Sequence, residues 1–456
     1  MTAISDTASV NPLPQIDPSP SIGAFQLLRA FRSNLLGAFG ADAYSDLRVS
    51  FSRFGRRFVF LSDPEDINHV FNTHIDRYRP NVLAERLLEP VTGRGILLLE
   101  GEEWDRFHRQ LIPVFQPRHV ESLIPSFHQT AIDHIESWGA GGDCTRDLLI
   151  DFRRLTLAVI ARSMLSIHDG ARTAELADFA SQAENAGALL RWQDYVALLV
   201  WRGVAQPAER KAIGARWRAW IQALIDRRPS IDDSGQAQDM LDLLRAARDA
   251  DGRPASTEDI ADHVGTMMSA GFATTALALF WMTVLLAHFP DQQEAIRQEL
   301  CEGSPFAPPS MQKLRSSRAA TAFLYEALRL YPPAYVIARE ARAEDRIGDF
   351  RIPRGSAVIV APWLVHRHAA LWCEPNRFDP DRFVRDGRIV TPKAWMPFGT
   401  GPRVCIGAAF ATMEILTIVR ALLGRYRVSL LGDLPSPVGR VMLQPDAQPL
   451  FKLTSL

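Results

Sequence analysis

The spacing of hydrophobic and polar residues changes twice along the chain. Between residues 45 and 62, short alternating segments such as DLRVSFSRFG and RRFVFLS are typical of β-strands. From 101 to 331, nearly every segment repeats its apolar residues at helical spacing, as in AQDMLDLLRAARDA. Beyond this, DRIGDFRIPRGSAVIVAPW predicts a hairpin with a Pro-Arg-Gly turn, and a last helix is expected over 408–424. The pattern predicts a mainly α fold with small β-sheets, of the α+β class.

One uncharged run, residues 264–287, is long enough to cross a bilayer. It is solitary, contains Gly, Ser and Thr, and has acidic flanks where a membrane anchor usually carries Lys or Arg. A helix that is apolar on all sides is otherwise a core helix, so we expect a buried central helix and no membrane anchor. It should begin near Ser256, where Glu258 and Asp259 favour the positive end of the helix dipole, and end before Pro290.

Composition limits the class of protein. The 456 residues carry 51 Lys and Arg against 52 Asp and Glu, so a strongly basic surface for nucleic acid is not expected. The four cysteines form no CxxC pair, which argues against a disulfide framework and favours a reducing, cytoplasmic environment. Residues 1–22 are rich in Pro and Ser and lack a basic region followed by an apolar run, so we expect a flexible arm rather than a signal peptide.

Neither an internal repeat nor an obvious linker divides the rest of the chain. We therefore predict a single domain over residues 23–456. Its β-rich lobe should lie mainly in residues 45–62 and 335–365, and its α-rich lobe mainly in residues 101–331 and 405–424.

The segment PFGTGPRVCIG, residues 397–407, surrounds Cys405 with glycines and one arginine. A sulfur placed just before a helix N-terminus lies near unpaired N–H groups and a positive dipole end, which both stabilise a thiolate. Such a thiolate can act as a nucleophile or as a metal ligand, and single-Cys ligation of iron is known for haem. The alternative from the residues alone is an ordinary buried core cysteine.

Five residues of this segment match the pattern F-x-x-G-x-R-x-C-x-G, and here the chain resembles the cytochrome P450 family of haem-thiolate monooxygenases. The matching residues are Phe398, Gly401, Arg403, Cys405 and Gly407. The resemblance covers about residue 23 to the C-terminus. It implies a cytochrome P450 fold in which haem b lies between the long central helix and the helix after the Cys loop, with Cys405 as the iron ligand and O2 as co-substrate.

A second match is YEALRLYPP, where Glu326 and Arg329 lie one helical turn apart and can form an ion pair. Most such pairs are solvated and contribute little. In the family, this pair is completed by an arginine from a downstream P-x-R-F-like element. The resemblance therefore implies that Arg377, in PNRF, is the third member of a structural cluster that holds the haem-binding loop.

A third match is AGFATT on the central helix, where Ala270, Gly271 and Thr274 share a face. Small residues on this face would let the helix approach a flat cofactor. A mid-helix threonine can bond the carbonyl four residues back and bend the helix, although Thr274 could also merely pack. The resemblance implies that Thr274 helps to deliver protons to dioxygen. The family usually has an acid at the position of Ala273, so this chain must use water, Thr275 or another group.

The fourth match, GEEWDRFHRQLIPVF, resembles the helix that holds a haem propionate through a tryptophan and a basic residue four positions later. Trp104 fits, and His108 replaces the usual basic residue, so its charge would depend on pH near neutrality. The resemblance implies that Arg339 and Arg403 reach the other propionate oxygens. The predicted cofactor-binding residues are Cys405, Trp104, His108, Arg339, Arg403, Phe398, Gly399 and Gly407. Three arginines are expected to face solvent, as a basic patch for an acidic electron donor or as a merely solvated face: Arg106, Arg109 and Arg118.

The candidate substrate walls are mostly aliphatic, so a largely apolar substrate is expected. They comprise Leu87, Leu88, Met267, Met268, Ala334, Tyr335 and Val336, with Ala270 and Thr274 beside them. Tyr335 or Arg79 could hold one polar group of the substrate, although each is more often structural. The walls do not distinguish fatty acids, terpenoids and aromatics.

The leading hypothesis is a soluble, monomeric, cytoplasmic haem-thiolate monooxygenase that acts on an apolar small molecule. The chain contains no GxGxxG fingerprint for a flavin or nicotinamide, so electrons must come from outside, as from a ferredoxin with its reductase. One alternative, motivated by Ala273, is a peroxide-driven or isomerising haem-thiolate enzyme. Another is a haem-binding sensor or carrier without catalysis.

Overall fold

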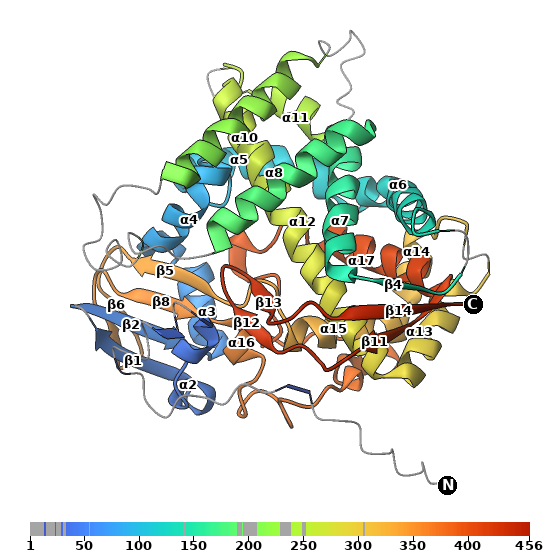
Figure 1. The fold of residues 1–456 in the computed structure, drawn as a ribbon. Coiled ribbons are helices and arrows are strands. Elements are labelled where there is room, and N and C mark those ends of the chain that lie inside the picture. Colours follow the sequence, from blue (N-terminus) through green and yellow to red (C-terminus); the bar gives the residue numbers. More distant parts are fainter. Residues whose placement is uncertain are drawn as a thin grey trace.

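A computed structural model describes most of the chain. The described residues are 13–14, 23, 29–30, 33–53, 55–139, 142–188, 194, 208–228, 239–248, 252–303 and 306–456. The flexible arm predicted for residues 1–22 therefore lies outside the described residues, except for positions 13 and 14. A small sheet lobe lies beside a larger helical lobe, with α12 passing through the middle (Figure 1). The predicted class, mainly α with small sheets, is confirmed.

The sheet lobe is built on five strands in the order β1-β2-β8-β5-β3. Strands β1 and β2 form an antiparallel hairpin, β8 lies parallel to β2, and β5 is antiparallel to both β8 and β3. The strands are β1 (Arg48–Arg53), β2 (Arg56–Leu61), β3 (Tyr78–Pro80), β5 (Ile337–Ala341) and β8 (Ala357–Val360). Segments almost 300 residues apart in the chain thus share one sheet, as the predicted lobe boundaries require.

The hairpin predicted in DRIGDFRIPRGSAVIVAPW has a different turn from the expected one. Strands β6 (Asp345–Ile347) and β7 (Phe350–Ile352) pair with each other and turn at Gly348, whose φ of +58° favours glycine. The Pro-Arg-Gly segment follows β7 and leads into β8, which pairs with β2 and β5. The predicted turn position was wrong because β8 finds its partners in the five-stranded sheet.

The helical lobe contains the long helices that periodicity predicted. Those nearest the candidate site are α5 (Gly101–Phe115), α6 (Pro117–Glu136), α7 (Leu148–Leu165), α12 (Thr257–His288), α15 (Arg318–Leu330) and α17 (Ala408–Leu423). The other long helices are α4 (Val82–Thr92), α8 (Gly170–Ala188), α10 (Ala208–Asp226) and α11 (Met240–Ala246), of which α10 and α11 lie at the top of Figure 1. Further helices are α2 (Asp42–Ser45), α3 (Pro64–Asn68), α13 (Pro290–Cys301), α14 (Met311–Ser316) and α16 (Pro362–Val365), with π-helix η2 (His69–Thr73) and 3-10 helix η5 (Gly401–Arg403).

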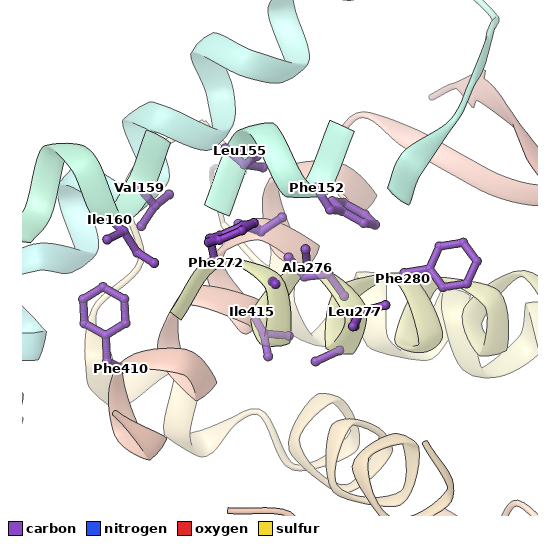
Figure 2. Close-up of a cluster of buried hydrophobic side chains, with 14 of the residues drawn as sticks. Phe152, Leu155, Val159, Ile160, Phe272, Ala276, Leu277, Phe280, Phe410 and Ile415 are labelled. Carbon is purple, nitrogen blue, oxygen red and sulfur yellow. The ribbon is translucent and has the colours of Figure 1, made fainter. Parts of the chain in front are cut away.

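Helix α12 is the central core helix, with the ends that the sequence predicted. Ser256 caps its N-terminus in a capping box with Asp259, and the helix ends at His288, before Pro290. Its side chains pack between α7 and α17, where Phe272 and Ala276 lie close to Leu155 and Ile415 (Figure 2). Among the described residues, α12 is the one helix long and apolar enough to span a membrane, but 78% of its most apolar window is buried in the protein.

The C-terminal segment forms two small sheets that sequence patterns did not predict. Strands β11 (Tyr426–Leu431) and β14 (Leu450–Ser455) pair with each other, and β14 also pairs with β4 (Cys144–Arg146). Strands β12 (Pro437–Gly439) and β13 (Leu443–Pro445) form a separate hairpin. The C-terminus is thereby fixed against the helical lobe near the start of α7 (Figure 1).

Candidate active site

The Cys405 loop is shaped by two glycines and one backbone hydrogen bond. Gly399 and Gly401 have φ values of +76° and +74°, in the left-handed region that favours glycine. A side chain on Gly401 would also lie 2.2 Å from the Phe71 carbonyl oxygen of η2. The Cys405 N–H donates to the Phe398 carbonyl over 2.9 Å, so the loop turns back on itself just before α17.

The Cys405 thiol is surrounded by protein and yet faces open space. The residue is exposed, whereas burial raises the pKa of its thiol, and a hydrogen bond from the Gly407 backbone lowers that pKa in part. A group can combine these two properties when it faces an internal hollow rather than bulk solvent. A thiol in this position would lose its proton on binding a metal ion, because a coordinating thiol is deprotonated outright.

Helix α12 is mostly buried, but it has one accessible stretch around Ala270 and Thr274. Ala270 is exposed and Thr274, one turn later, is half-buried, while Ala273 and Thr275 are buried. The Thr274 hydroxyl donates to the Ala270 carbonyl over 2.7 Å, as the sequence suggested. Because α12 packs against α17, this accessible stretch and the Cys405 loop belong to neighbouring elements (Figure 2).

Gly271 has a different role from the one expected. A side chain on Gly271 would lie 2.5 Å from the Ile160 side chain of α7. The missing side chain therefore permits close packing of α12 on α7, rather than close approach of a flat cofactor. Of the small residues predicted to share a cofactor-facing position, Ala270 is the one that the structure leaves exposed.

Two arginines near the loop, Arg339 and Arg403, have few partners for their positive charges. Burial and the charge of Arg403 lower the pKa of Arg339 to about 10, and burial likewise lowers the pKa of Arg403. Within the described part of the chain, neither side chain makes a hydrogen bond or an ion pair. The Arg339 guanidinium lies 5.3 Å from the Phe71 ring centre, and that of Arg403 lies 4.7 Å from the Trp104 ring centre. The charges of Glu100 on both arginines, and of Asp105 on Arg403, raise these pKa values in part, but neither acid forms an ion pair with them, so the two guanidinium groups can still bind an anion.

Trp104 and His108 come together on α5, as predicted. Their rings stack with centres 4.4 Å apart. Burial lowers the pKa of His108, and Arg403 lowers it further, while Asp105 opposes this change. The imidazole is therefore neutral at neutral pH unless an anion binds beside it. Of the arginines expected to face solvent, two are exposed, Arg109 and Arg118, whereas Arg106 is half-buried against the Phe107 ring.

The predicted structural cluster exists, but with a different third member. Glu326 and Arg329 are fully buried and form two hydrogen bonds of 2.6 and 2.8 Å. The third side chain is Arg382, whose Nε lies 3.3 Å from Glu326 Oε1. The Arg377 side chain instead pairs with Glu374 at the surface, and it is the Arg377 carbonyl that accepts from Arg329.

The prediction of Arg377 was wrong because the sequence contains two P-x-R-F elements. PNRF ends at residue 378 and PDRF ends at residue 383. The second was overlooked, although it carried the same signal. Its Pro380 begins a 3-10 turn, Pro380–Phe383, which directs Arg382 towards α15.

The predicted substrate walls are only partly accessible. Met267 and Met268 are buried on α12, Ala334 is exposed, and three others are half-buried: Leu87, Leu88 and Val336. Neither Tyr335 nor Arg79 is free to hold a polar group of the substrate. Tyr335 is fully buried and its hydroxyl donates to the Arg440 carbonyl over 2.5 Å, while Arg79 forms an ion pair with Glu340. Both residues are structural, and Tyr335 is not a wall.

These observations fit a haem. In the described part of the chain, no group of three His, Cys, Asp or Glu side chains could hold a metal ion, so a metal at Cys405 would have to bring other ligands with it. A haem iron does so and takes a single axial thiolate. Its two carboxylates suit the guanidinium groups of Arg339 and Arg403, which form no ion pair among the described residues.

Comparison with known proteins agrees with this geometry. The family model described as cytochrome P450 matches residues 47–450. Cytochrome P450 72A15 from Arabidopsis thaliana is 28% identical over 385 residues, which are 81% of this chain and 73% of that protein. Putative cytochrome P450 132 from Mycobacterium tuberculosis is 29% identical over 400 residues, covering 83% of this chain and 84% of that protein. The human ultra-long-chain fatty acid omega-hydroxylase is 28% identical over 365 residues, covering 75% and 68%.

Among solved structures, retinoic acid bound cyanobacterial CYP120A1 has the same fold. The TM-score is 0.76, with 24% identity, and the match covers 90% of this chain and 92% of that one. Since the family model matches residues 47–450, which are most of the chain, the protein belongs to the cytochrome P450 family.

Proposed function

We propose that the protein is a haem-thiolate monooxygenase that inserts one oxygen atom of O2 into an apolar small molecule. Cytochrome P450 proteins are monooxygenases that use haem and O2, and the proposal adds the roles of this chain's residues, haem b as the cofactor and the class of substrate. The observation that carries it is Cys405, an exposed residue in a tight glycine-shaped loop just before α17 whose thiol has enough protein around it to raise its pKa.

Each residue of the proposed cofactor site has a distinct task. Cys405 would bind the haem iron, and Arg339 and Arg403 would neutralise the haem carboxylates, with Trp104 and His108 beside them. When bound, haem supplies electron transfer and the activation of O2. The Gly407 backbone N–H, already a donor to the sulfur, would stabilise the thiolate.

Thr274 is the proposed proton-handling residue. Its hydroxyl lies at the accessible stretch of α12 and holds its proton against the Ala270 carbonyl. It could receive a proton from water and release its own towards O2 by rotating away from that carbonyl. Ala273 cannot replace the usual acid, and the buried position of Thr275 keeps it away from bulk water. Water is therefore the proposed proton source.

An apolar substrate follows from the wall residues that remain. Met267, Met268, Leu87, Leu88 and Val336 carry no charge, and Tyr335 and Arg79 are bound to other parts of the protein. Relatives named an ultra-long-chain fatty acid omega-hydroxylase and an 11-oxo-beta-amyrin 30-oxidase act on molecules of this kind. We propose a fatty acid, a terpenoid or an aromatic compound.

The proposed setting is a cytoplasmic monomer that receives electrons from a ferredoxin and its reductase. Arg109 and Arg118, exposed on and after the helix that carries Trp104, provide positive charge for an acidic donor. Dependence of the reduction rate on salt would test this pairing, because screening weakens such attraction.

The proposal is tested first by the spectrum of the dithionite-reduced protein with carbon monoxide. Wild-type protein should show the thiolate-type band, and Cys405→Ala should lose it completely because no other described residue can take the place of the sulfur. Titration with fatty acids, terpenoids and aromatics should convert the ferric spectrum from low to high spin for one class. A wild-type spectrum without the thiolate-type band would refute the assignment of Cys405.

A second variant tests the role of Thr274. Thr274→Ala should retain haem and substrate binding, while electrons are diverted to hydrogen peroxide, because the proton-donating hydroxyl is lost. The measurement is product formed per reductant consumed. Unchanged coupling would show that another group delivers the protons. Turnover with peroxide alone at the rate obtained with electron donors would instead favour a peroxide-driven enzyme.

A further inference from the structure

His366 occupies a fully buried position between α15 and the Cys405 loop. It directly follows α16, and both ring nitrogens are used. Nδ1 lies 3.0 Å from the Arg329 carbonyl oxygen, and Nε2 lies 2.9 Å from the Met396 backbone nitrogen. A carbonyl can only accept and an amide N–H can only donate, so Nδ1 carries the proton and Nε2 accepts.

The same histidine is also held through its backbone. Arg329 Nη1 donates to the His366 carbonyl over 2.6 Å, which makes the contact between these two residues reciprocal. Burial, together with Arg329 and Arg367, lowers the pKa of His366 well below its usual value, so the ring keeps the neutral form that these bonds require.

Met396 connects His366 to the turn that bears Cys405 through backbone hydrogen bonds. Its carbonyl accepts from the Gly399 N–H over 3.0 Å, and Phe398, two residues later, accepts from the Cys405 N–H over 2.9 Å. A continuous series of hydrogen bonds and short backbone steps thus runs from the buried Glu326–Arg329 pair through His366 to the turn that bears the sulfur.

We propose that His366 is a positioning residue that ties the Cys405 loop to the Glu326–Arg329 pair. This inference rests on the proposed function, because it assigns a purpose to the position of the thiolate. The Arg329 bond orients the ring, and the Met396 bond fixes the start of the loop. Loss of the Met396 bond alone should free the sulfur from its position without unfolding the protein.

Two substitutions separate the two bonds. In His366→Gln, the side-chain carbonyl reaches the place of Nε2 and can accept from the Met396 N–H. In His366→Asn, the shorter amide can donate to the Arg329 carbonyl but does not reach Met396. We expect His366→Asn to raise the ratio of thiol-type to thiolate-type carbon monoxide band about tenfold, the change produced by losing one buried hydrogen bond. His366→Gln should stay close to wild type.

His368 provides a matched control. It is equally buried, its Nδ1 accepts from the Ala370 N–H over 3.2 Å, and its Nε2 has no hydrogen-bond partner among the described residues. His368→Asn and His368→Gln remove a buried imidazole two residues away, without touching Met396. Both should leave the carbon monoxide spectrum unchanged.

Hydrogen exchange of the purified protein supplies a readout that does not depend on the haem spectrum. Peptides covering residues 394–407 should exchange about tenfold faster in His366→Asn than in wild type or His366→Gln, with equal exchange in α12. Equal spectra and equal exchange in all variants would overturn the proposal. So would parallel losses in both His366 variants with faster exchange throughout the protein, since this indicates a general structural role. If wild type lacked the thiolate-type band, the proposed function would fail, and loop exchange alone would decide whether His366 ties the loop.

Discussion

The floor and the roof of the candidate site differ in how much of their packing depends on directional hydrogen bonds. The floor consists of the Cys405 loop, α15 and residues 362–383, and here buried polar groups form directional hydrogen bonds. Glu326 and Arg329 are both fully buried, and His366 uses both of its ring nitrogens. Such a network is satisfied in one arrangement and becomes costly when a single partner is removed.

The roof, formed by α4, α10 and the first half of α12, contains one buried ion-pair cluster, and at two further contacts its helices lie so close that only a glycine fits. A side chain on Gly214 of α10 would lie 1.5 Å from the Pro90 carbonyl oxygen of α4, and one on Gly265 of α12 would lie 2.4 Å from Trp217 Nε1. The buried carboxylate of Asp194 joins α4 to α10, because it accepts hydrogen bonds from Arg86 of α4 and Arg210 of α10.

This difference suggests a division of tasks between the two regions. In the proposed function the floor would hold the haem, and directional bonds with one satisfied arrangement suit a fixed cofactor. The roof would face the substrate, and contacts at glycine positions can be altered in small steps of volume. Two relatives of 28% identity are named for different substrates, a beta-amyrin derivative and an ultra-long-chain fatty acid.

The largest effect is expected in the floor. Arg329→Ala removes both hydrogen bonds of the ion pair and leaves the buried Glu326 carboxylate with only the Asp379 N–H and the Arg382 side chain, so it should lower the free energy of unfolding by about 3–5 kcal/mol or prevent haem incorporation. Arg382→Ala should cost about 1–3 kcal/mol, because it removes one hydrogen-bond partner of a buried charge.

Arg377→Ala is the matched control for this series, since the Arg377 side chain is exposed and paired only with Glu374 at the surface. It should change stability by less than about 0.5 kcal/mol. Urea unfolding followed by circular dichroism measures all three variants. Equal losses for Arg377→Ala and Arg382→Ala would contradict the assignment of Arg382 to the cluster.

An intermediate effect is expected in the roof. The added methyl group in Gly214→Ala meets the Pro90 backbone, which cannot rotate away, so α4 and α10 must separate at a cost of about 1–3 kcal/mol. Apolar ligands should then bind more weakly in spectral titrations, while the carbon monoxide band stays thiolate-type. In Gly170→Ala the methyl group would meet nothing within 4 Å, which makes this variant the control. A loss of the thiolate-type band in Gly214→Ala would show that roof and floor are coupled.

A graded effect, small near pH 5 and growing as pH rises, concerns Glu414 of α17. Both carboxyl oxygens are buried without a hydrogen-bond partner among the described residues, and burial raises the pKa well above 4.5. Between pH 4.5 and the raised pKa, the unfolded chain releases a proton that the folded protein retains. Stability should therefore fall as pH rises through this range, by at most about 1.4 kcal/mol per pH unit.

Glu414→Gln should remove this slope, because the amide does not titrate. Wild type and variant should differ little at pH 4 and diverge as pH rises, with the variant more stable at pH 8. Unfolding free energies measured at several pH values test this expectation. Parallel curves for the two proteins would show that Glu414 finds a partner, and would place it with the satisfied polar groups of the floor.

Sequence patterns by themselves determined what depends on neighbouring residues. The bounds of α12 followed from its cap and its uncharged run, Thr274 bonds the Ala270 carbonyl as expected, and the Cys405 motif identified the family. Each of these depends on residues within one segment, where helical periodicity, capping and glycine geometry act over a few positions.

Only the tertiary structure decided which distant partners meet. It chose Arg382 over Arg377 for Glu326, placed Ile160 against Gly271, joined β8 to β2, and brought β4 to the C-terminal strand β14. In some of these cases two local segments carried the same pattern, as PNRF and PDRF do, and in others no local pattern indicated the partner. The choice among them was made by packing and by the cost of leaving a buried polar group without a partner, which are properties of the whole fold.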